Sequence, residues 1–311
     1  MTKKLFEVIV VATMSAGKST LINALIGEEL LHSANEATTA TITSIHNKDS
    51  FKKFIGVAYD YSDKLVDYKN SVDADLLKDW NSDEEIKTIN LMGNFRDINN
   101  SKYSEIVIYD TPGPNNSQDE GHELLTMEVV NDGNYGLILY ILNATQLGVQ
   151  GDYDLLKKIH QNINNEPTKK ILFILNKADQ IDEEKEESLN TVVKNAEKYL
   201  TEIGFKKPEI VPLSAKISLL AQKVLNKEKL TRSEFYELIK NINVFGNKNI
   251  NQNAIVSAKI KNKLNERIVS FTNEGEITIR GQSFSIKSLR QLKANSGLDL
   301  VKIILQQYLV R

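Results

Sequence analysis

The sequence predicts an α/β fold: a doubly wound, mostly parallel sheet with one antiparallel strand and helices on both faces. Short apolar runs typical of buried strands alternate with longer amphipathic segments that have helical spacing. Polar motifs with a defined chemistry directly follow several of these runs. In such folds the crossovers are right-handed and ligands bind at the carboxyl ends of the strands. We therefore expect one functional site along that edge of the sheet.

Composition excludes several classes of function. The 311 residues are 41% apolar and 26% charged, as in a globular chain that can bury a large core. A net charge of −2 gives no reason to expect nucleic-acid binding. The absence of cysteine excludes disulfides, thiolate metal sites and cysteine catalysis, and fits a cytoplasmic location. We expect neither a signal peptide nor a membrane-spanning helix, since no apolar run approaches the roughly 20 residues that a bilayer requires.

The clearest motif lies near the start of the chain. Residues 8–12 form an apolar run, a turn of small residues follows, and residues 18–25 have apolar side chains at helical spacing. Together they predict an anion site, because backbone N–H groups and the helix dipole converge there. In this motif Lys18 reaches the β- and γ-phosphates, and the Ser19 hydroxyl binds Mg²⁺. The residues assigned to nucleotide contacts are Met14, Ser15, Ala16, Gly17, Lys18, Ser19 and Thr20.

The motif departs from G-x-x-x-x-G-K-[ST] at its first position, where Ala12 replaces glycine. That position closes the strand and accepts a small side chain, so the anion site is retained. An ordinary strand–turn–helix with a chance G-K-S is the alternative. The downstream motifs argue against it.

Two later segments have the composition of nucleotide switches. Thr39, with Thr38 as the substitute, lies between the phosphate loop and an expected β-hairpin over residues 41–61. A threonine here can supply a Mg²⁺ ligand and sense the γ-phosphate. A threonine cluster that only leads into an edge strand is the other interpretation. After the next core strand, Asp110 is placed to hold the Mg²⁺ shell, and the Gly113 N–H to meet the γ-phosphate.

A further motif predicts which base is bound. Asn176-Lys-Ala-Asp179 follows the apolar run at residues 170–175. The Asp179 carboxylate can accept hydrogen bonds from N1–H and the exocyclic amine of guanine, a donor pair that adenine lacks. The Lys177 stem can lie along the base, and Asn176 is expected to connect this loop to the phosphate loop. One β-α-β unit later, backbone N–H groups are placed to contact the guanine O6 at Ser214, Ala215 and Lys216.

The remaining segments are expected to complete this domain. Residues 62–100 are charged and amphipathic, and predict one or two short helices with Trp80 as a packing residue. Helices are expected at residues 218–225, 233–242, 254–271 and 298–309, and a small hairpin at 276–286. We expect a nucleotide-binding core at residues 1–216, a mainly helical insertion at 217–295 and a closing helix at 296–311.

These motifs resemble, in their order, those of the translation-factor class of GTPases. Met-Ser-Ala-Gly-Lys-Ser-Thr-Leu-Ile-Asn-Ala-Leu, Asn-Glu-Ala-Thr-Thr-Ala and Leu-Asn-Ala-Thr-Gln are similar, more narrowly, to bacterial dynamin-like proteins. The resemblance implies a P-loop NTPase fold that hydrolyses GTP to GDP and phosphate with Mg²⁺, and a role for Ser15 in binding a monovalent cation, K⁺ or Na⁺. The implied catalytic residues are Ser15, Lys18, Thr39 and Gly113, and the implied Mg²⁺ ligands are Ser19, Thr39 and Asp110.

The resemblance also implies activation by self-association. Met14 stands where many dynamins have a glutamine that helps to place the attacking water, and Pro114 stands where Ras-type proteins have one. No side chain is therefore assigned to orient the water. Backbone carbonyls, the monovalent cation and a GTP-dependent homodimer through the nucleotide face are expected to do so. Slow turnover by the monomer is the corresponding expectation.

Membrane remodelling is an implication of the family alone. Dynamins continue into stalk helices and a membrane-binding tip, so any peripheral association with the inner face of the cell membrane would use regions not in this chain. Two alternatives stay open. A monomeric Era-type switch GTPase for ribosome assembly should carry a basic RNA-binding module, which the net charge disfavours. A GTP-binding scaffold with little turnover is kept open by Met14 and Pro114.

Overall fold

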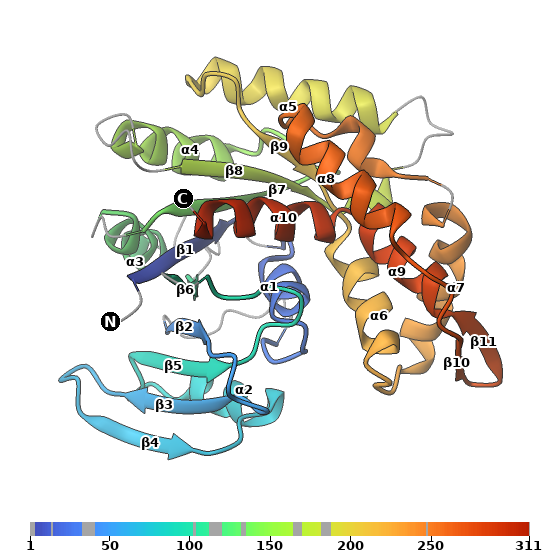
Figure 1. The fold of residues 1–311 in the computed structure, drawn as a ribbon. Helices are drawn as coiled ribbons and strands as arrows, with labels where there is room; N and C mark the ends of the chain where they lie inside the picture. The colour runs from blue at the N-terminus through green and yellow to red at the C-terminus, as the bar shows by residue number, and fades with distance from the viewer. Residues whose placement is uncertain are drawn as a thin grey trace.

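A nine-stranded sheet forms the centre of the molecule, in the order β4-β3-β5-β2-β6-β1-β7-β8-β9 (Figure 1). Its helices cover both faces, so the α/β fold class expected from the sequence is confirmed. The computed structural model describes residues 4–13, 15–32, 41–101, 104–111, 120–131, 135–163, 170–181, 188–246 and 248–310.

Five parallel strands form the half of the sheet that carries the motifs. Their central strands are apolar along most of their length, because a strand covered by helices on both faces has no solvent side. Every residue of β7 is buried, for example. These strands are β6 (Ser104–Asp110), β1 (Lys4–Ala12), β7 (Leu137–Asn143), β8 (Lys170–Asn176) and β9 (Ile210–Pro212).

Alternate residues of β1 point into two separate apolar clusters. Val8 and Val10 pack in a cluster with side chains of α1 and α10, whereas Ile9 and Val11 pack in a cluster with side chains of α3, α4 and α5. The two helical layers therefore fix β1, and with it the loop that follows, from both sides. The helices are α1 (Lys18–Ile26) and α10 (Leu298–Leu309) on one face, and α3 (Glu120–Asn131), α4 (Gln150–Ile163) and α5 (Leu189–Ile203) on the other.

The other half of the sheet corrects the expected hairpin over residues 41–61. Its strands are formed as β2 (Ile42–Asn47) and β3 (Ile55–Tyr59), but β5 (Thr88–Gly93) lies between them. β2 is parallel to β5 and antiparallel to β6, and β4 (Leu65–Lys69) forms the antiparallel edge. Three strands, β2, β5 and β4, therefore run opposite to β1.

Asn47 explains why β2 pairs with β5. Its side chain at the end of β2 accepts from Phe95 N at 2.9 Å and donates to Ile98 O at 2.8 Å. These bonds hold β2 beside the segment that follows β5. One helix forms within residues 62–100, where one or two were expected. Residues 88–93 form β5 instead, in which Ile89 and Leu91 are buried at alternate positions, the period of a strand.

The helix expected around Trp80 is confirmed as α2 (Ala74–Ser82). Asp73 caps it, since its carboxylate accepts from Leu76 N at 3.0 Å. Trp80 is buried over Gly56, where an added Cβ would lie 2.8 Å from the indole ring. Its Nε1 donates to Asp67 on β4 at 3.1 Å. The expected packing role of Trp80 is therefore confirmed.

Residues 215–295 are mainly helical and lie beside the carboxyl ends of the parallel strands, whereas α10 runs across the face of the sheet (Figure 1). The helix over residues 286–295 was not expected, because the hairpin was extended to residue 286. Ser285 ends the hairpin and also caps this helix through Ser288 N. The elements are α6 (Ala215–Leu225), α7 (Arg232–Phe245), η3 (Ile250–Asn253), α8 (Ala258–Val269), β10 (Glu276–Ile279), β11 (Gln282–Ser285) and α9 (Ile286–Asn295).

A buried ion network joins α9 and α10 to the segment after β5. Lys302 is fully buried, and its Nζ donates to Arg96 O at 2.8 Å and lies 3.7 Å from Asp97 Oδ2. Lys293 bridges Asp97, at 2.6 Å, and the buried Asp299, at 3.5 Å. Burial, reinforced by the nearby Lys293 cation, lowers the pKa of Lys302 to about 7.

Lys302 is expected to make stability rise with pH. Between its folded pKa of about 7 and its ordinary value of 10.5, the unfolded chain holds a proton that the folded protein lacks. The free energy of unfolding of the wild type should therefore increase, relative to Lys302→Met, by roughly 3 kcal/mol between pH 6.5 and 9.5. Urea unfolding at both pH values measures this. Lys263→Met, which removes an exposed lysine of α8, should keep the wild-type slope, and an equal slope in Lys302→Met would contradict the assignment.

Candidate functional site

The phosphate loop joins β1 to α1 at the carboxyl ends of the parallel strands (Figure 1). Ser15 (φ 60°) and Gly17 (φ 93°) are left-handed, which turns the chain so that α1 begins at Lys18. Ala16 N donates to Thr13 O at 3.3 Å and closes the turn. Gly17 is the N-cap and no described side chain caps the helix, so an anion can approach the N-terminal end of α1. This backbone geometry suits an anion.

Asn176 connects its own loop (residues 176–179, expected from the sequence to read the base and here called the base-reading loop) to the phosphate loop, as expected, and also to the segment after β9. Its Nδ2 donates to Ala16 O at 2.8 Å, and its Oδ1 accepts from Ala215 N at 3.0 Å. The side chain is only 3% exposed. One amide therefore holds three segments that are far apart in the sequence, and this expected connection is confirmed.

Lys18 and Asp110 lie together in the described structure. The parallel register pairs Val10 with Asp110, so β6 ends beside the phosphate loop. Lys18 Nζ donates to Asp110 Oδ1, and both side chains are largely buried. Thr111 strengthens this junction, because its Oγ1 donates to Val10 O at 2.9 Å. The strand register thus brings Asp110 to the residue that precedes Ser19.

The residues expected to hold Mg²⁺ are compatible with that role where they are described. A hydroxyl and a carboxylate are oxygen ligands of the kind that Mg²⁺ prefers, together with water and phosphate oxygens. Ser19 follows Lys18 on α1, and Asp110 contacts Lys18. The described residues contain no group of three or more His, Asp or Glu side chains that could hold a metal without such help. Four residues with expected roles, Met14, Thr38, Thr39 and Gly113, lie outside the described residues, as does Pro114.

The base-reading loop follows β8. Lys177 is left-handed (φ 65°) and begins the short helix η1 (Ala178–Gln180), on which Asp179 lies half-buried. Ala178 N donates to Leu213 O at 3.1 Å, which attaches this loop to the segment after β9. Ser214 then caps α6, its Oγ accepting from Ile217 N at 3.3 Å. Asp179 and Ser214 thus lie on adjoining segments, as the sequence predicted.

α7 adds two carboxylates that sequence reasoning did not assign to the site. Glu234 Oε1 lies 4.0 Å from Lys216 Nζ and also accepts from Lys223 at 2.7 Å. Burial raises the pKa of Glu237; Lys216 opposes this shift and the Asp179 charge adds to it. α7 is therefore close to the base-reading residues. The only local signal was the capping box that begins at Thr231 and ends at Glu234, which predicts a helix start and no function.

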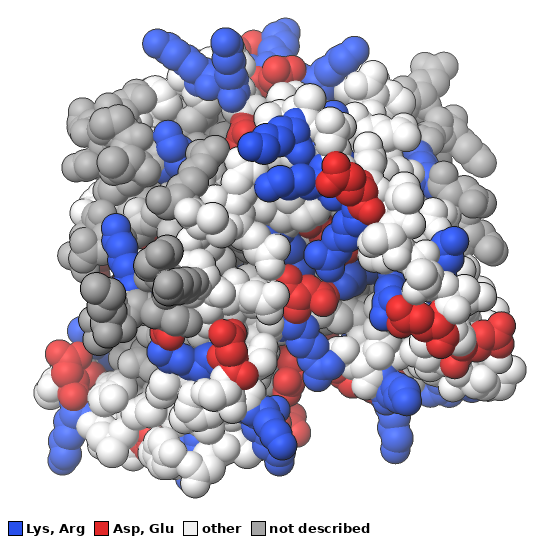
Figure 2. Space-filling model, viewed as in Figure 1, with Lys and Arg blue, Asp and Glu red and all other residues white. Residues whose placement is uncertain are grey.

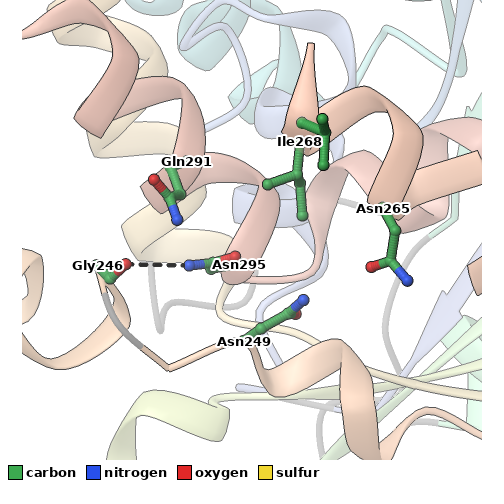
Figure 3. Close-up of a pocket in the computed structure, with 7 residues that line it drawn as sticks. Gly246, Asn249, Asn265, Ile268, Gln291 and Asn295 are labelled. Atoms are coloured by element: carbon green, nitrogen blue, oxygen red, sulfur yellow. Dashed lines mark hydrogen bonds between the residues drawn. The ribbon is translucent and has the colours of Figure 1, made fainter. Parts of the chain in front are cut away.

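A cavity of about 360 Å³ lies elsewhere, between α7, α8 and α9 (Figure 3). Its lining is rich in side-chain amides and has no ionisable group. Asn295 Nδ2 donates to Gly246 O at 3.4 Å and to Phe245 O at 2.8 Å. None of the motif residues lines this cavity, so it gives no reason to place a nucleotide-binding site there. The lining residues are Gly246, Asn249, Asn265, Ile268, Val269, Gln291 and Asn295.

Comparisons with known proteins agree with the motifs. An uncharacterised protein from Caldicellulosiruptor sp. is 26% identical over 74% of this chain, and Dynamin-like protein 1 from Campylobacter jejuni is 27% identical over 75% of it. The chain spans 54% and 36% of the length of these two relatives. A solved bacterial dynamin, described as one of an oligomerised pair that senses and tethers membranes, has a TM-score of 0.52 at 19% identity. That match covers 85% of this chain and 43% of the dynamin.

The family itself follows from a match over more than half of the chain. The sequence model of the Dynamin family matches residues 8–178, from β1 to the base-reading loop. This range contains the phosphate loop, Asp110 and Asn176. The chain therefore belongs to the dynamin family and carries its GTPase domain.

Proposed function

We propose that this domain hydrolyses GTP to GDP and phosphate with Mg²⁺. Family membership supports the proposal, and one observation carries it: Asn176 binds Ala16 of the phosphate loop and Ala215 of the segment after β9. A nucleotide placed with its phosphates at one loop and its base at the other would span the two segments that this side chain joins. In this proposal the buried Asn176 amide would set the distance between the phosphate subsite and the base subsite.

Each motif residue has a separate role in this proposal. The N–H groups of residues 15–20 and the Lys18 ammonium bind the phosphates, for which Lys18 exchanges its contact with Asp110. Ser19, Thr39 and Asp110 would hold Mg²⁺, which neutralises charge on the β- and γ-phosphate oxygens. Lys177 and Asp179 bind guanine, with the backbone N–H of Lys216 at its O6. The expected O6 contacts of Ser214 and Ala215 are corrected, because Ser214 N donates to Ser296 O at 2.9 Å and Ala215 N to Asn176 Oδ1 at 3.0 Å. Ser15 would help to hold K⁺ or Na⁺, and Thr39 and Gly113 would contact the γ-phosphate.

Hydrolysis is proposed to depend on a second copy of the domain. Met14 and Pro114 leave the loops without a glutamine to orient water. A homodimer formed through the nucleotide face would exclude solvent and fix the loops, which replaces the missing side chain. Because the chain spans 54% and 36% of the length of these two relatives, membrane remodelling at the inner face of the cell membrane is proposed only where this domain is part of a longer protein.

Two observations bear on the alternatives. Figure 2 shows Lys and Arg side chains interspersed with Asp and Glu over the described part of this face, which gives an RNA-binding module no support there. The family match favours a dynamin over an Era-type switch.

The described part of the chain has no helix long and apolar enough to cross a bilayer.

The rate of GTP hydrolysis is expected to rise with protein concentration. Specific activity should increase severalfold from low to high micromolar protein in K⁺ or Na⁺, because dimers turn over faster than monomers. Lys18→Ala provides the blank, and replacing K⁺ and Na⁺ with a bulky organic cation should remove the increase. A slow, concentration-independent rate with tight GTP binding would support a monomeric switch. Binding without single-turnover hydrolysis would support a scaffold.

A further inference from the structure

A buried carboxylate contacts the first residue of the phosphate loop. Asp152 is in the first turn of α4 and is 1% exposed. Its Oδ1 accepts from Thr13 Oγ1 and from the Tyr140 hydroxyl, each at 2.9 Å. Thr13 directly follows β1, and Tyr140 is in β7. One carboxylate oxygen therefore joins α4, β7 and the phosphate loop.

Burying an ionised carboxylate has a large desolvation cost, which the hydrogen bonds to Asp152 must offset. Burial raises the pKa of Asp152, and the hydroxyls of Tyr140 and Thr13 oppose that shift by stabilising the charged form. The N-terminal end of α4 favours a negative charge as well. Tyr199 on α5 is near enough for the Asp152 charge to add to the burial that raises the pKa of its hydroxyl. An apolar residue could fill this position without these costs.

The two bonds to Asp152 differ in what they restrain. The Tyr140 bond joins β7 to α4, which already belong to one apolar cluster. The Thr13 bond reaches the loop, where Thr13 O also accepts from Ala16 N and Ala16 O accepts from Asn176. The first half of the loop is therefore held at one end by Asp152 and at the other by Asn176.

We propose that Asp152 is a positioning residue for the phosphate loop, acting through Thr13. Its carboxylate fixes the start of the loop, so that the N–H groups that follow are oriented before the nucleotide arrives. Binding then requires less ordering of the loop, which increases affinity. This inference rests on the proposed function, because a loop with no anion to bind would gain nothing from such orientation.

A matched pair of substitutions tests the proposal. Each substitution removes one of the two hydroxyl groups that donate to Asp152 Oδ1. Thr13→Val, nearly identical in shape, is expected to raise the dissociation constant for GTP about tenfold. In the nucleotide-free protein it should also speed amide exchange at Ala16, whose N–H donates to Thr13 O, about tenfold. Tyr140→Phe should leave both values within about twofold of the wild type, since it leaves the Thr13 bond in place.

Asp152→Asn completes the test, because asparagine keeps an acceptor oxygen. Its effect should be smaller than that of Thr13→Val, and the double variant should be no worse than the more affected single variant if the two residues act through one bond. Wild-type exchange at Ala16 in Thr13→Val would overturn the proposal. So would equal effects of Thr13→Val and Tyr140→Phe, which would indicate general loosening. If the wild type binds no guanine nucleotide, the proposed function fails, while the exchange measurement still decides the role of Asp152.

Discussion

Replacing Asp179 by asparagine is expected to lower the affinity for GTP by at least about a thousandfold. The carboxylate offers two acceptor oxygens to the N1–H and exocyclic amine of guanine. In asparagine one oxygen becomes an NH₂ group, which would face a donor of the base. One of the two guanine donors would then face the NH₂ group without an acceptor, and an unpaired donor in a binding site is costly.

The same substitution is expected to favour xanthine nucleotides. Xanthine carries a carbonyl oxygen where guanine carries the exocyclic amine, so the new NH₂ group would have an acceptor to meet. Binding of fluorescent GTP and xanthosine triphosphate to the wild type and to Asp179→Asn measures this change in base preference. Asp154→Asn, an exposed carboxylate on α4, is the matched control and should leave both affinities unchanged. Retained GTP affinity in Asp179→Asn would show that this loop does not read the base.

The parallel half of the fold could be predicted from local pattern. Its strands have continuous apolar runs because both faces are covered, and the motifs follow these runs directly. Glycine at position 17 and the buried Asn176 lie where the sequence placed them, because strand–loop–helix geometry is specified within a few residues. The phosphate loop and the base-reading loop then meet as a consequence of the strand order.

The antiparallel half could not be predicted in this way. β2 and β3 are neighbours in the sequence, but they are separated by β5, which comes about 30 residues later. A hairpin is the usual prediction when two strands are close in sequence. The observed pairing of β2 with β5 depends instead on long-range bonds such as those of Asn47. The bond between Thr13 and Asp152 is similar: 139 positions separate the two residues, Thr13 occupies a variable position of the phosphate-loop motif, and Asp152 belongs to no motif.

Gly17→Ala is expected to abolish most of the activity that this site supports. A Cβ on Gly17 would lie 2.3 Å from Asn176 Nδ2. The Asn176 side chain must then move, which breaks the bond of Nδ2 to Ala16 O and disturbs that of Oδ1 to Ala215 N. The backbone of Gly17, at φ 93°, is also unfavourable for alanine. We expect the free energy of unfolding to fall by about 2–4 kcal/mol. GTP hydrolysis should fall at least about a hundredfold, because small displacements of a positioning group have such effects.

Gly281→Ala separates the two causes. Gly281 is also left-handed, at φ 80°, but no atom lies within 4 Å of the position that its Cβ would take. This variant therefore carries the backbone strain without the collision, and it should lose about 1 kcal/mol of stability with unchanged hydrolysis. If Gly17→Ala behaved like Gly281→Ala in both denaturation and hydrolysis assays, Asn176 would not be required to hold the loop. A large loss confined to Gly17→Ala would show that the contact between Asn176 and the phosphate loop, rather than glycine flexibility alone, sets the geometry of the site.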